Sequence, residues 1–441
     1  MKEHPFPSCS DKVKLALLGA KAPSAEHVFT NLYEKTAPQE ALRCDEASAS
    51  SRSLGSLHGL LISLKDNLDV AGETTLAGGV VCKGEPPAAS DALVVQRLRE
   101  AGAVLLGKTN MSEFAFSGVG VNPHYGTPVN PCDVKQARVP GGSSSGAAVS
   151  VALGLADAGI GTDTGGSIRI PAALCGLVGF KSTQSRISLR GVMELSRSLD
   201  TVGSISKSVS DCLRVDAAMS HQPLPTKPID LKPMRFAVPQ TLFFDDIDPT
   251  VAHAFERTIS LISAAGAEVI RMPFTELADI ASLSLPAGFS PVEGYAVHHQ
   301  RLDRGEAQID PRVVARMKLG EHVTAADYIG LIDRRHAWIE KAQWVLQGFD
   351  AMLCPTVPIV APLTQPLLSD DEAFFRVNRL LLRNPSAINY LDGCSFSLPC
   401  HQPDEMPVGL MVSSVSGQDA ALAQIALAIE ALLSKVIREQ S

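Results

Sequence analysis

The chain has 441 residues, of which 45% are hydrophobic and 20% charged, a balance that excludes a disordered chain and predicts a folded globular protein. Its formal net charge of −8 argues against the basic surface of a direct nucleic-acid binder. Nine cysteines are scattered singly without CxxC pairs, so we expect reduced thiols rather than a disulfide framework or a zinc site.

The first apolar segment is KVKLALLGAKA, residues 12–22, in which lysines precede apolar residues. Its apolar core, residues 15–18, is too short for a signal peptide. No run reaches the length of about 18 apolar residues that suggests a membrane span. We therefore expect a cytoplasmic protein without a membrane partner.

Helical and extended patterns alternate along the chain. Residues 91–100 predict a helix capped by Ser90 and ended by Gly102, with a strand at 103–106. Residues 146–159 predict a helix, and 160–163 the end of a strand. Further strands are predicted at 177–180, 234–238 and 267–272, the last after a helix at 251–266 that Gly266 stops. This alternation predicts an α/β layered fold around a largely buried sheet.

Composition changes too little along the chain to mark a flexible linker, so we predict one domain over residues 1–441. Residues 280–350 are expected to form a helical elaboration of it. Two proline-rich stretches, 220–233 and 355–373, are interpreted as surface connections, because prolines there forbid a long helix.

Two glycine-rich motifs suggest chemistry that their context does not favour. GAVLLGKT, residues 102–109, matches a phosphate-binding loop, but a helix precedes it and its middle residues predict a strand. GSSSG, residues 142–146, matches the nucleophile elbow of an α/β-hydrolase esterase with Ser144 at its centre. That motif needs a buried strand before it and a late histidine. The preceding segment is polar and broken by proline, and His336 and His401 are both consistent with ordinary surface residues.

A third motif, GIGTDTGGSIRIP at residues 159–171, places Ser167 in a glycine turn after an apolar run. Such a turn directs successive N–H groups at one point and can form an oxyanion hole, although a helix-capping serine is the simpler alternative. A serine nucleophile needs a base, and a lysine serves if burial lowers its pKa. Lys65, at the end of the apolar run LLISL, is the candidate; a lysine that reaches water from a strand end is the alternative.

SLKDN, the long segment from PGGSSSG to LVGFK, and the spacing between them resemble the amidase signature family from about residue 55 to the C-terminal MPVGLMV. The resemblance implies an α/β fold with a central mixed sheet covered by helices on both faces and a signature core at about 55–215. It also implies a Ser-cisSer-Lys triad of Lys65, Ser143 and Ser167, with a cis peptide bond between Gly142 and Ser143. The 24-residue separation of Ser143 from Ser167 matches the family and favours Ser143 over Ser144 and Ser145.

The resemblance further assigns the oxyanion hole to the N–H groups of Thr164, Gly165, Gly166 and Ser167. We expect Asp163 and Arg169 to support the loop, with Asp200 as a further candidate for this support. By analogy with the family, the candidates for the substrate pocket are Phe114, Phe116 and Tyr125. The mechanism requires no metal and no organic cofactor.

The resemblance implies hydrolysis of a small carboxylic amide with release of ammonia, through an acyl-enzyme. The first alternative is the glutaminase component of an aminoacyl-tRNA amidotransferase, its A subunit, which feeds ammonia to a partner. A second alternative is an esterase that uses Ser144. A third is a binding protein that has lost catalysis, but the presence of all three triad residues argues against it. The resemblance also allows a homodimer. The acyl group stays open.

Overall fold

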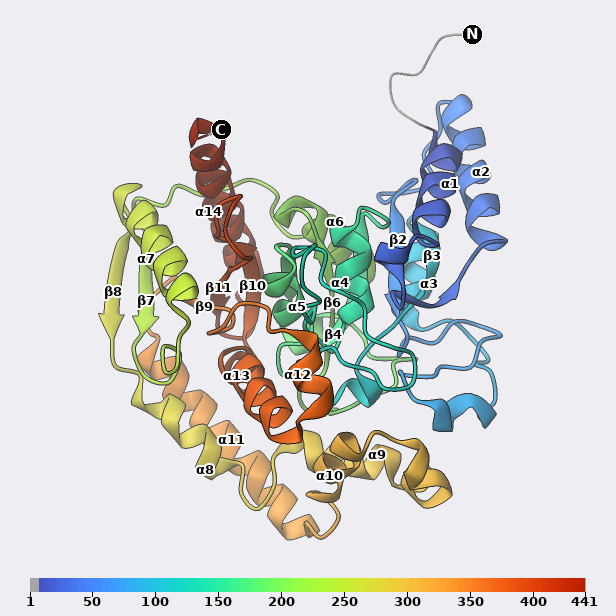
Figure 1. The fold of residues 1–441 in the computed structure, drawn as a ribbon. Coiled ribbons are helices and arrows are strands. Elements are labelled where there is room, and N and C mark those ends of the chain that lie inside the picture. Colours follow the sequence, from blue (N-terminus) through green and yellow to red (C-terminus); the bar gives the residue numbers. More distant parts are fainter. Residues whose placement is uncertain (1–7, 441) are drawn as a thin grey trace.

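Eleven strands form one continuous sheet through the molecule (Figure 1). The structure, a computed structural model, describes residues 8–440. Across the sheet the strand order is β1-β3-β2-β4-β6-β5-β10-β11-β9-β7-β8. The strands are β1 Phe29–Leu32, β2 Leu61–Lys65, β3 Val104–Thr109, β4 Ala158–Asp163, β5 Val178–Lys181, β6 Thr201–Ser206, β7 Arg235–Pro239, β8 Glu268–Met272, β9 Ala351–Pro355, β10 Cys394–Pro399 and β11 Gly409–Ser414.

Parallel pairs lie toward the two ends of the sheet and antiparallel pairs in its middle. β2 runs parallel to β3 and β4, and β7 runs parallel to β8 and β9. From β4 through β6, β5, β10 and β11 to β9, each neighbouring pair is antiparallel. The edge strand β1 is antiparallel to β3. The predicted α/β fold with a central mixed sheet is confirmed.

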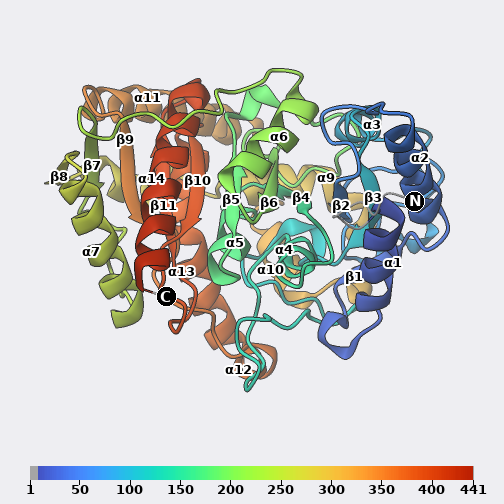
Figure 2. The same ribbon diagram turned by 90° about the horizontal axis from the view of Figure 1, so that it is seen from above.

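Helices cover both faces of this sheet (Figure 2). The α-helices within residues 8–440 are α1 Cys9–Gly19, α2 Thr36–Ala49, α3 Leu93–Glu100, α4 Ser145–Ala152, α5 Arg169–Leu174, α6 Val209–Ser220, α7 Pro249–Ala264, α8 Asp279–Leu283, α9 Phe289–Gly305, α10 Pro311–Lys318, α11 Ala325–Val345, α12 Thr364–Ser369, α13 Asp371–Tyr390 and α14 Asp419–Gln440. Short 3-10 turns lie at Pro23–Ala25, Val80–Gly84, Glu113–Ala115, Gln184–Arg186, Thr275–Ala278 and Glu306–Gln308.

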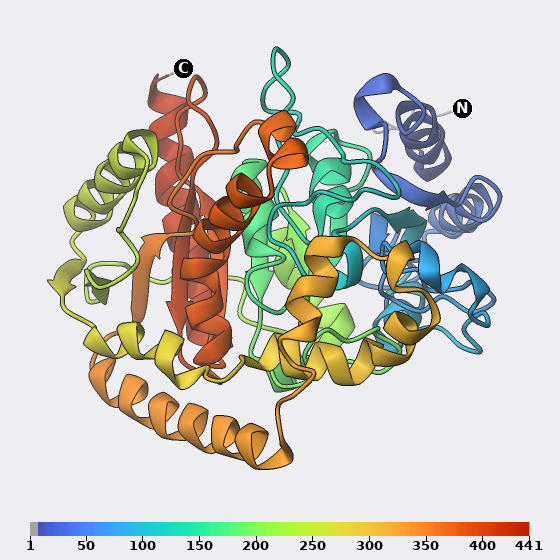
Figure 3. The same cartoon turned by 60° about the horizontal axis from the view of Figure 1, so that its bottom comes forward.

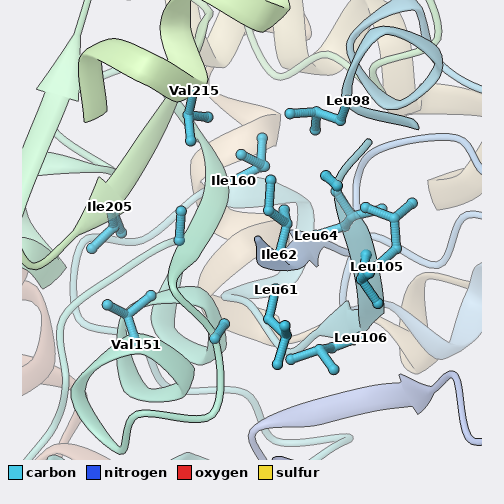
Figure 4. Packing of buried hydrophobic residues seen from close by; sticks show 14 of the residues in the cluster. Leu61, Ile62, Leu64, Leu98, Leu105, Leu106, Val151, Ile160, Ile205 and Val215 are labelled. Carbon is cyan, nitrogen blue, oxygen red and sulfur yellow. The ribbon is translucent and has the colours of Figure 1, made fainter. Parts of the chain in front are cut away.

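The hydrophobic core lies between the sheet and these helices. Val151 of α4 and Val215 of α6 lie on opposite sides of the strands in Figure 4, with Ile62 and Ile160 between them. All five residues of β2 are buried. A strand that is covered on both faces shows no alternation of polar and apolar residues, which explains the continuous apolar run that ends at Lys65.

The structure shifts several predicted boundaries. The helix predicted at 91–100 begins at Leu93, and the side chain of Ser90 does not cap it, because Ala92 occupies the cap position. The helix predicted at 146–159 ends at Ala152, since Gly154 has a φ of +71° and turns the chain into β4. The helix predicted at 251–266 corresponds to α7, which begins and ends two residues earlier, and the strand after it is β8.

The two proline-rich stretches differ in their surroundings. Most residues of 220–233 are exposed or half-buried, as a surface connection should be. The interpretation of 355–373 as a surface connection is wrong for its first half, where Thr356, Val357 and Ala361 are buried. The hydroxyl of Thr356 lies 2.8 Å from that of Ser397 in β10, so this segment belongs to the core. The second half contains the short helix α12 and the start of α13.

Four helices, α8 to α11, occupy the segment where a helical elaboration is predicted, and Figure 3 shows them in yellow to orange on one side of the sheet. All nine cysteines are free thiols in the structure. Between residues 8 and 440, no helix is long and apolar enough to cross a membrane.

Candidate active site

Lys65 is the last residue of β2 and is fully buried. Its Nζ lies 2.7 Å from Ser143 Oγ, 2.8 Å from Thr162 Oγ1 and 3.4 Å from the carbonyl oxygen of Thr162. All three partners are neutral. Burial lowers the pKa of Lys65 from 10.5 to about 7, although the negative charges of Asp200 and Asp163 oppose this shift. A large share of the amine is therefore neutral near pH 7.

Ser143 lies in the loop before α4, and the peptide bond that joins it to Gly142 is cis. A Cβ on Gly142 would lie 2.7 Å from the backbone nitrogen of Gly120, so a side chain does not fit there. Ser143 is fully buried. The neighbouring Ser144 donates its N–H to the carbonyl of Ser167 at 3.2 Å. This hydrogen bond holds the loop of Ser143 against the loop of Ser167.

Ser167 lies in the turn between β4, which ends at Asp163, and α5, which begins at Arg169. Gly166 has a φ of +121°, and a Cβ on it would lie 2.5 Å from Cβ of Pro385. Both the backbone conformation and the close approach therefore require glycine. Ser167 is only 2% exposed, but it lines a pocket. The strand-to-helix turn predicted for this segment is confirmed.

Asp163 holds this turn in place. Its carboxylate accepts hydrogen bonds from the N–H of Gly166 (2.8 Å), from Arg169 Nε (3.0 Å) and from Asn389 Nδ2 (2.8 Å). Burial disfavours the charge, but the Arg169 guanidinium and its hydrogen bonds hold the pKa of Asp163 well below its usual 3.8. Both side chains are fully buried. Asp163 and Arg169 thus lie where residues that support the loop are expected.

The hydrogen bond to Asp163 changes the set of candidate oxyanion donors. The N–H of Gly166 already donates to Asp163, so it is not free to donate to an oxyanion as expected. The N–H groups of Thr164, Gly165 and Ser167 have no acceptor among the described residues. These three are the donors that remain for an oxyanion.

Asp200 lies on the other side of the same turn. Its carboxylate accepts from the hydroxyl of Thr164 (2.5 Å) and from the N–H groups of Leu195 (2.8 Å) and Ser196 (3.1 Å). Burial raises the pKa of Asp200 to about 6. The structure therefore places this carboxylate beside the loop, as the sequence suggested.

Ser167, Thr164 and Gly165 line one wall of a pocket with a volume of about 240 Å³. Segments far apart in the sequence supply the other walls, including α9, α10 and α13. Most of these walls are apolar. Their larger side chains are Phe116, Leu195, Leu199, Phe289, Leu382 and Tyr390.

Of the three aromatic pocket candidates, only Phe116 lines this pocket. Phe114 does not line it, although it belongs to the same buried cluster as Phe116; its ring lies 4.4 Å from that of His298. Tyr125 lies near Lys83, whose Nζ is 5.7 Å from the centre of the tyrosine ring. Spacing along the sequence did not separate these residues because the chain turns sharply at Phe114, where φ is +49°.

Neither of the competing glycine motifs forms the site that it resembles. Residues 104–109 are the buried strand β3, in which Lys108 pairs with Asp66 at 2.9 Å, so no phosphate loop forms. Ser144 is fully buried at the start of α4, its hydroxyl lies 3.4 Å from the carbonyl of Thr162, and no strand leads into the motif. The residues around each motif had predicted that neither a phosphate loop nor a nucleophile elbow forms.

Sequence reasoning missed three residues that the structure brings to the site. Thr162 bonds Lys65, Asn389 bonds Asp163, and Arg316 lines the pocket. Thr162 directly precedes Asp163, which is a local signal. Asn389 and Arg316 belong to α13 and α10, more than a hundred residues away in the chain, and no local pattern marks them. Among the described residues, no group of three His, Cys, Asp or Glu side chains could hold a metal ion.

Comparison with known proteins shows the family and the fold of the chain. The family model for amidases matches residues 20–423. The chain is 35% identical over 403 residues to 2-amino-5-chloromuconic acid deaminase of Comamonas testosteroni, with 90% of this chain and 86% of that protein covered. It is 34% identical over 428 residues to the A subunit of glutamyl-tRNA(Gln) amidotransferase from Moorella thermoacetica, with 89% and 86% covered. A crystal structure of an amidase superposes with a TM-score of 0.86 at 32% identity and 96% coverage of both chains.

Proposed function

The chain belongs to the amidase family, and from that premise we propose that it hydrolyses the carbon–nitrogen bond of a small carboxylic amide and releases ammonia. In this proposal Ser167 is the nucleophile, Ser143 the bridging serine and Lys65 the base. The contact of 2.7 Å between Lys65 Nζ and Ser143 Oγ, in a fully buried setting, is the observation that carries it.

A neutral Lys65 suits the hydrogen bonds around it. The neutral amine has two N–H groups and one lone pair. The two N–H groups donate to the hydroxyl and the carbonyl of Thr162, at 2.8 and 3.4 Å. The lone pair then accepts the hydroxyl proton of Ser143, which leaves the oxygen of Ser143 free to accept a proton from Ser167.

The reaction then proceeds through an acyl-enzyme. Ser167 Oγ attacks the amide carbon while its proton passes to Ser143 and the proton of Ser143 passes to Lys65. The N–H groups of Thr164, Gly165 and Ser167 stabilise the oxyanion. Lys65 returns its proton through Ser143 to the amide nitrogen, the carbon–nitrogen bond breaks, and ammonia leaves. Water attacks the resulting ester with the same relay as base, and the acid is released.

A second candidate is a glutaminase that delivers ammonia to a partner protein. The 34% identity to the glutamyl-tRNA(Gln) amidotransferase protein supports this candidate. The triad would act in the same way, but glutamine would be the substrate and turnover would depend on the partner. A homodimer is a further proposal, which light scattering on the purified chain tests.

Ammonia release by the purified chain tests these proposals. The panel contains aromatic, aliphatic and dicarboxylic amides together with glutamine, and Ser167→Ala is the inactive control. Turnover that vanishes in Ser167→Ala supports the free-standing amidase. Added hydroxylamine should divert part of the acyl group to a hydroxamate, because an acyl-enzyme partitions between water and hydroxylamine. A folded protein that is inactive on every amide of the panel would contradict the free-standing role.

A further inference from the structure

One wall of the pocket beside Ser167 carries a cationic side chain without an acidic partner. Arg316 projects from α10 and lines the pocket together with Ser167. A guanidinium has five N–H donors. One nitrogen of Arg316 donates to the backbone carbonyl of Phe116, and the guanidinium carbon lies 5.5 Å from the centre of the Phe116 ring. Among the described residues the other donors have no hydrogen-bond acceptor, and Arg316 forms no ion pair.

Burial lowers the pKa of Arg316 to about 10, and no neighbouring carboxylate offsets that cost. Arg316 is half-buried, whereas Arg169 of the same site is fully buried and pairs with Asp163. Charged side chains in proteins are rarely buried unless they are paired. The unused donors of Arg316 therefore fit an anion that is supplied from outside the chain.

The approach to the pocket has the same charge. A neighbouring groove shares Arg316, Leu382 and Ser386 with the pocket, and two further arginines of α13, Arg379 and Arg383, line it. Neither the pocket nor the groove has an Asp or Glu in its lining. Arg383 is partly offset, because Asp245 and Asp246 lie within electrostatic range of it. The groove beside the pocket therefore keeps a positive charge, which favours anions there.

Much of the remaining lining of the pocket is apolar. Phe116, Leu199, Phe289 and Leu382 belong to this lining. A hydrocarbon or aromatic group therefore fits between the two polar ends, and the pocket volume of about 240 Å³ restricts it to a small one.

We propose that the substrate is the monoamide of a small dicarboxylic acid, with its amide at Ser167, an apolar spacer between the walls, and its free carboxylate on Arg316. This inference rests on the proposed amidase function and specifies its substrate class. An arginine binds a carboxylate through paired N–H donors. Arg316 is a specificity-determining residue here, and it takes no part in the proton relay. The product is the dicarboxylate.

The test compares each monoamide with the corresponding diamide, which has nearly the same shape but lacks the charge. Suitable pairs are glutaramate with glutaramide, adipamate with adipamide, and 4-carbamoylbenzoate with terephthalamide. For the wild-type chain, kcat/KM for the best monoamide should exceed that for its diamide by about 10- to 100-fold, the range for a hydrogen bond to a charged group. A wild type that cleaves diamides equally well or better overturns the inference, while the proposed function stands.

Substitution of Arg316 separates recognition from folding. Arg316→Gln should lower kcat/KM for the monoamide by about 10- to 100-fold, mainly through KM, and change the diamide by less than about 3-fold. Arg316→Lys keeps the charge and should retain part of the preference. Arg376→Gln is the matched control, because Arg376 is an exposed arginine of α13 outside the pocket. Equal losses on monoamide and diamide would mean that Arg316 is only structural, and the inference would fail.

If the wild type cleaves no amide, the proposed function is contradicted, but calorimetry still tests the proposed substrate class. Ser167→Ala protein is titrated with adipate and with terephthalate. At least one should bind, and binding should weaken by about 10-fold or more when Arg316→Gln is added. Absence of binding, or binding that is insensitive to Arg316→Gln, overturns the proposed substrate class.

Discussion

The pH dependence of kcat/KM tests Lys65 as the base, because only the neutral amine accepts a proton. An ordinary lysine with a pKa of 10.5 is neutral in about 0.03% of molecules at pH 7. With the pKa lowered to about 7 by burial, about half of the molecules have a neutral Lys65 at that pH. Burial therefore raises the active fraction by more than about 1,000-fold at neutral pH.

This pKa predicts the shape of the profile. The protonated form predominates below the pKa and is inactive, so kcat/KM should fall as the pH decreases. The value should be half-maximal near pH 7 and about 10% of the plateau at pH 6. The assay is ammonia release between pH 5 and 9 at substrate concentrations well below KM, where the profile reports groups of the free enzyme. A profile that is flat from pH 5.5 to 8, or centred above pH 9, would refute the assignment.

Asp200→Asn provides a second test of the same reasoning. The negative charge of Asp200 raises the pKa of Lys65, so its removal should move the profile toward lower pH. The variant is nearly isosteric. Its amide oxygen accepts from the N–H groups of Leu195 and Ser196, and its amide nitrogen donates to the hydroxyl of Thr164. A shift toward higher pH would contradict the electrostatic account.

Three further predictions use purified variants or simple additions. Ser143→Ala should lower kcat by about 100- to 10,000-fold because the proton relay is interrupted. The kcat of the control variant Ser144→Ala should stay within about 3-fold of the wild-type value. Similar losses of kcat in both variants would contradict the choice of Ser143 as the bridging serine. Asp163→Asn should lower the free energy of unfolding in urea by about 3–5 kcal/mol, since it leaves the buried charge of Arg169 without its partner; a loss below about 1 kcal/mol would mean that the pair contributes little. EDTA should leave ammonia release unchanged, because the proposed relay of Lys65, Ser143 and Ser167 uses no metal; a loss that added metal restores would contradict this.

The local parts of the site could be predicted from the sequence. The run LLISL ends at Lys65 and predicts a strand there, and the burial of β2 on both faces decides between a buried lysine and one that reaches water. The glycines before Ser167 similarly mark a turn that no other residue can form, as the φ of +121° at Gly166 shows. The choice among the three serines at 143–145 is different. Their local context is nearly the same, so that choice came from resemblance to a family.

The sequence failed where distant segments meet. One miss was local, because the N–H of Gly166 donates to Asp163 only three residues away. The aromatic candidates Phe114 and Tyr125 followed family analogy, and neither lines the pocket. The proline-rich segment after β9 looked like a surface connection, yet its first half is buried under α5 and α13. Prolines in a segment indicate that it forms no long helix, but they do not indicate whether it is buried.

The sequence by itself thus determined the α/β class, the strand that carries Lys65 and the turn that carries Ser167. These properties depend on residues that are close together in the chain, where periodicity, turn chemistry and spacing are visible. Only the tertiary structure decided what surrounds the reacting groups. Asn389 reaches Asp163 across 226 positions, and Arg316 reaches the pocket from a helix added outside the sheet. Such contacts arise because distant segments of the chain pack into one core, and local sequence patterns do not predict which segments will contact each other.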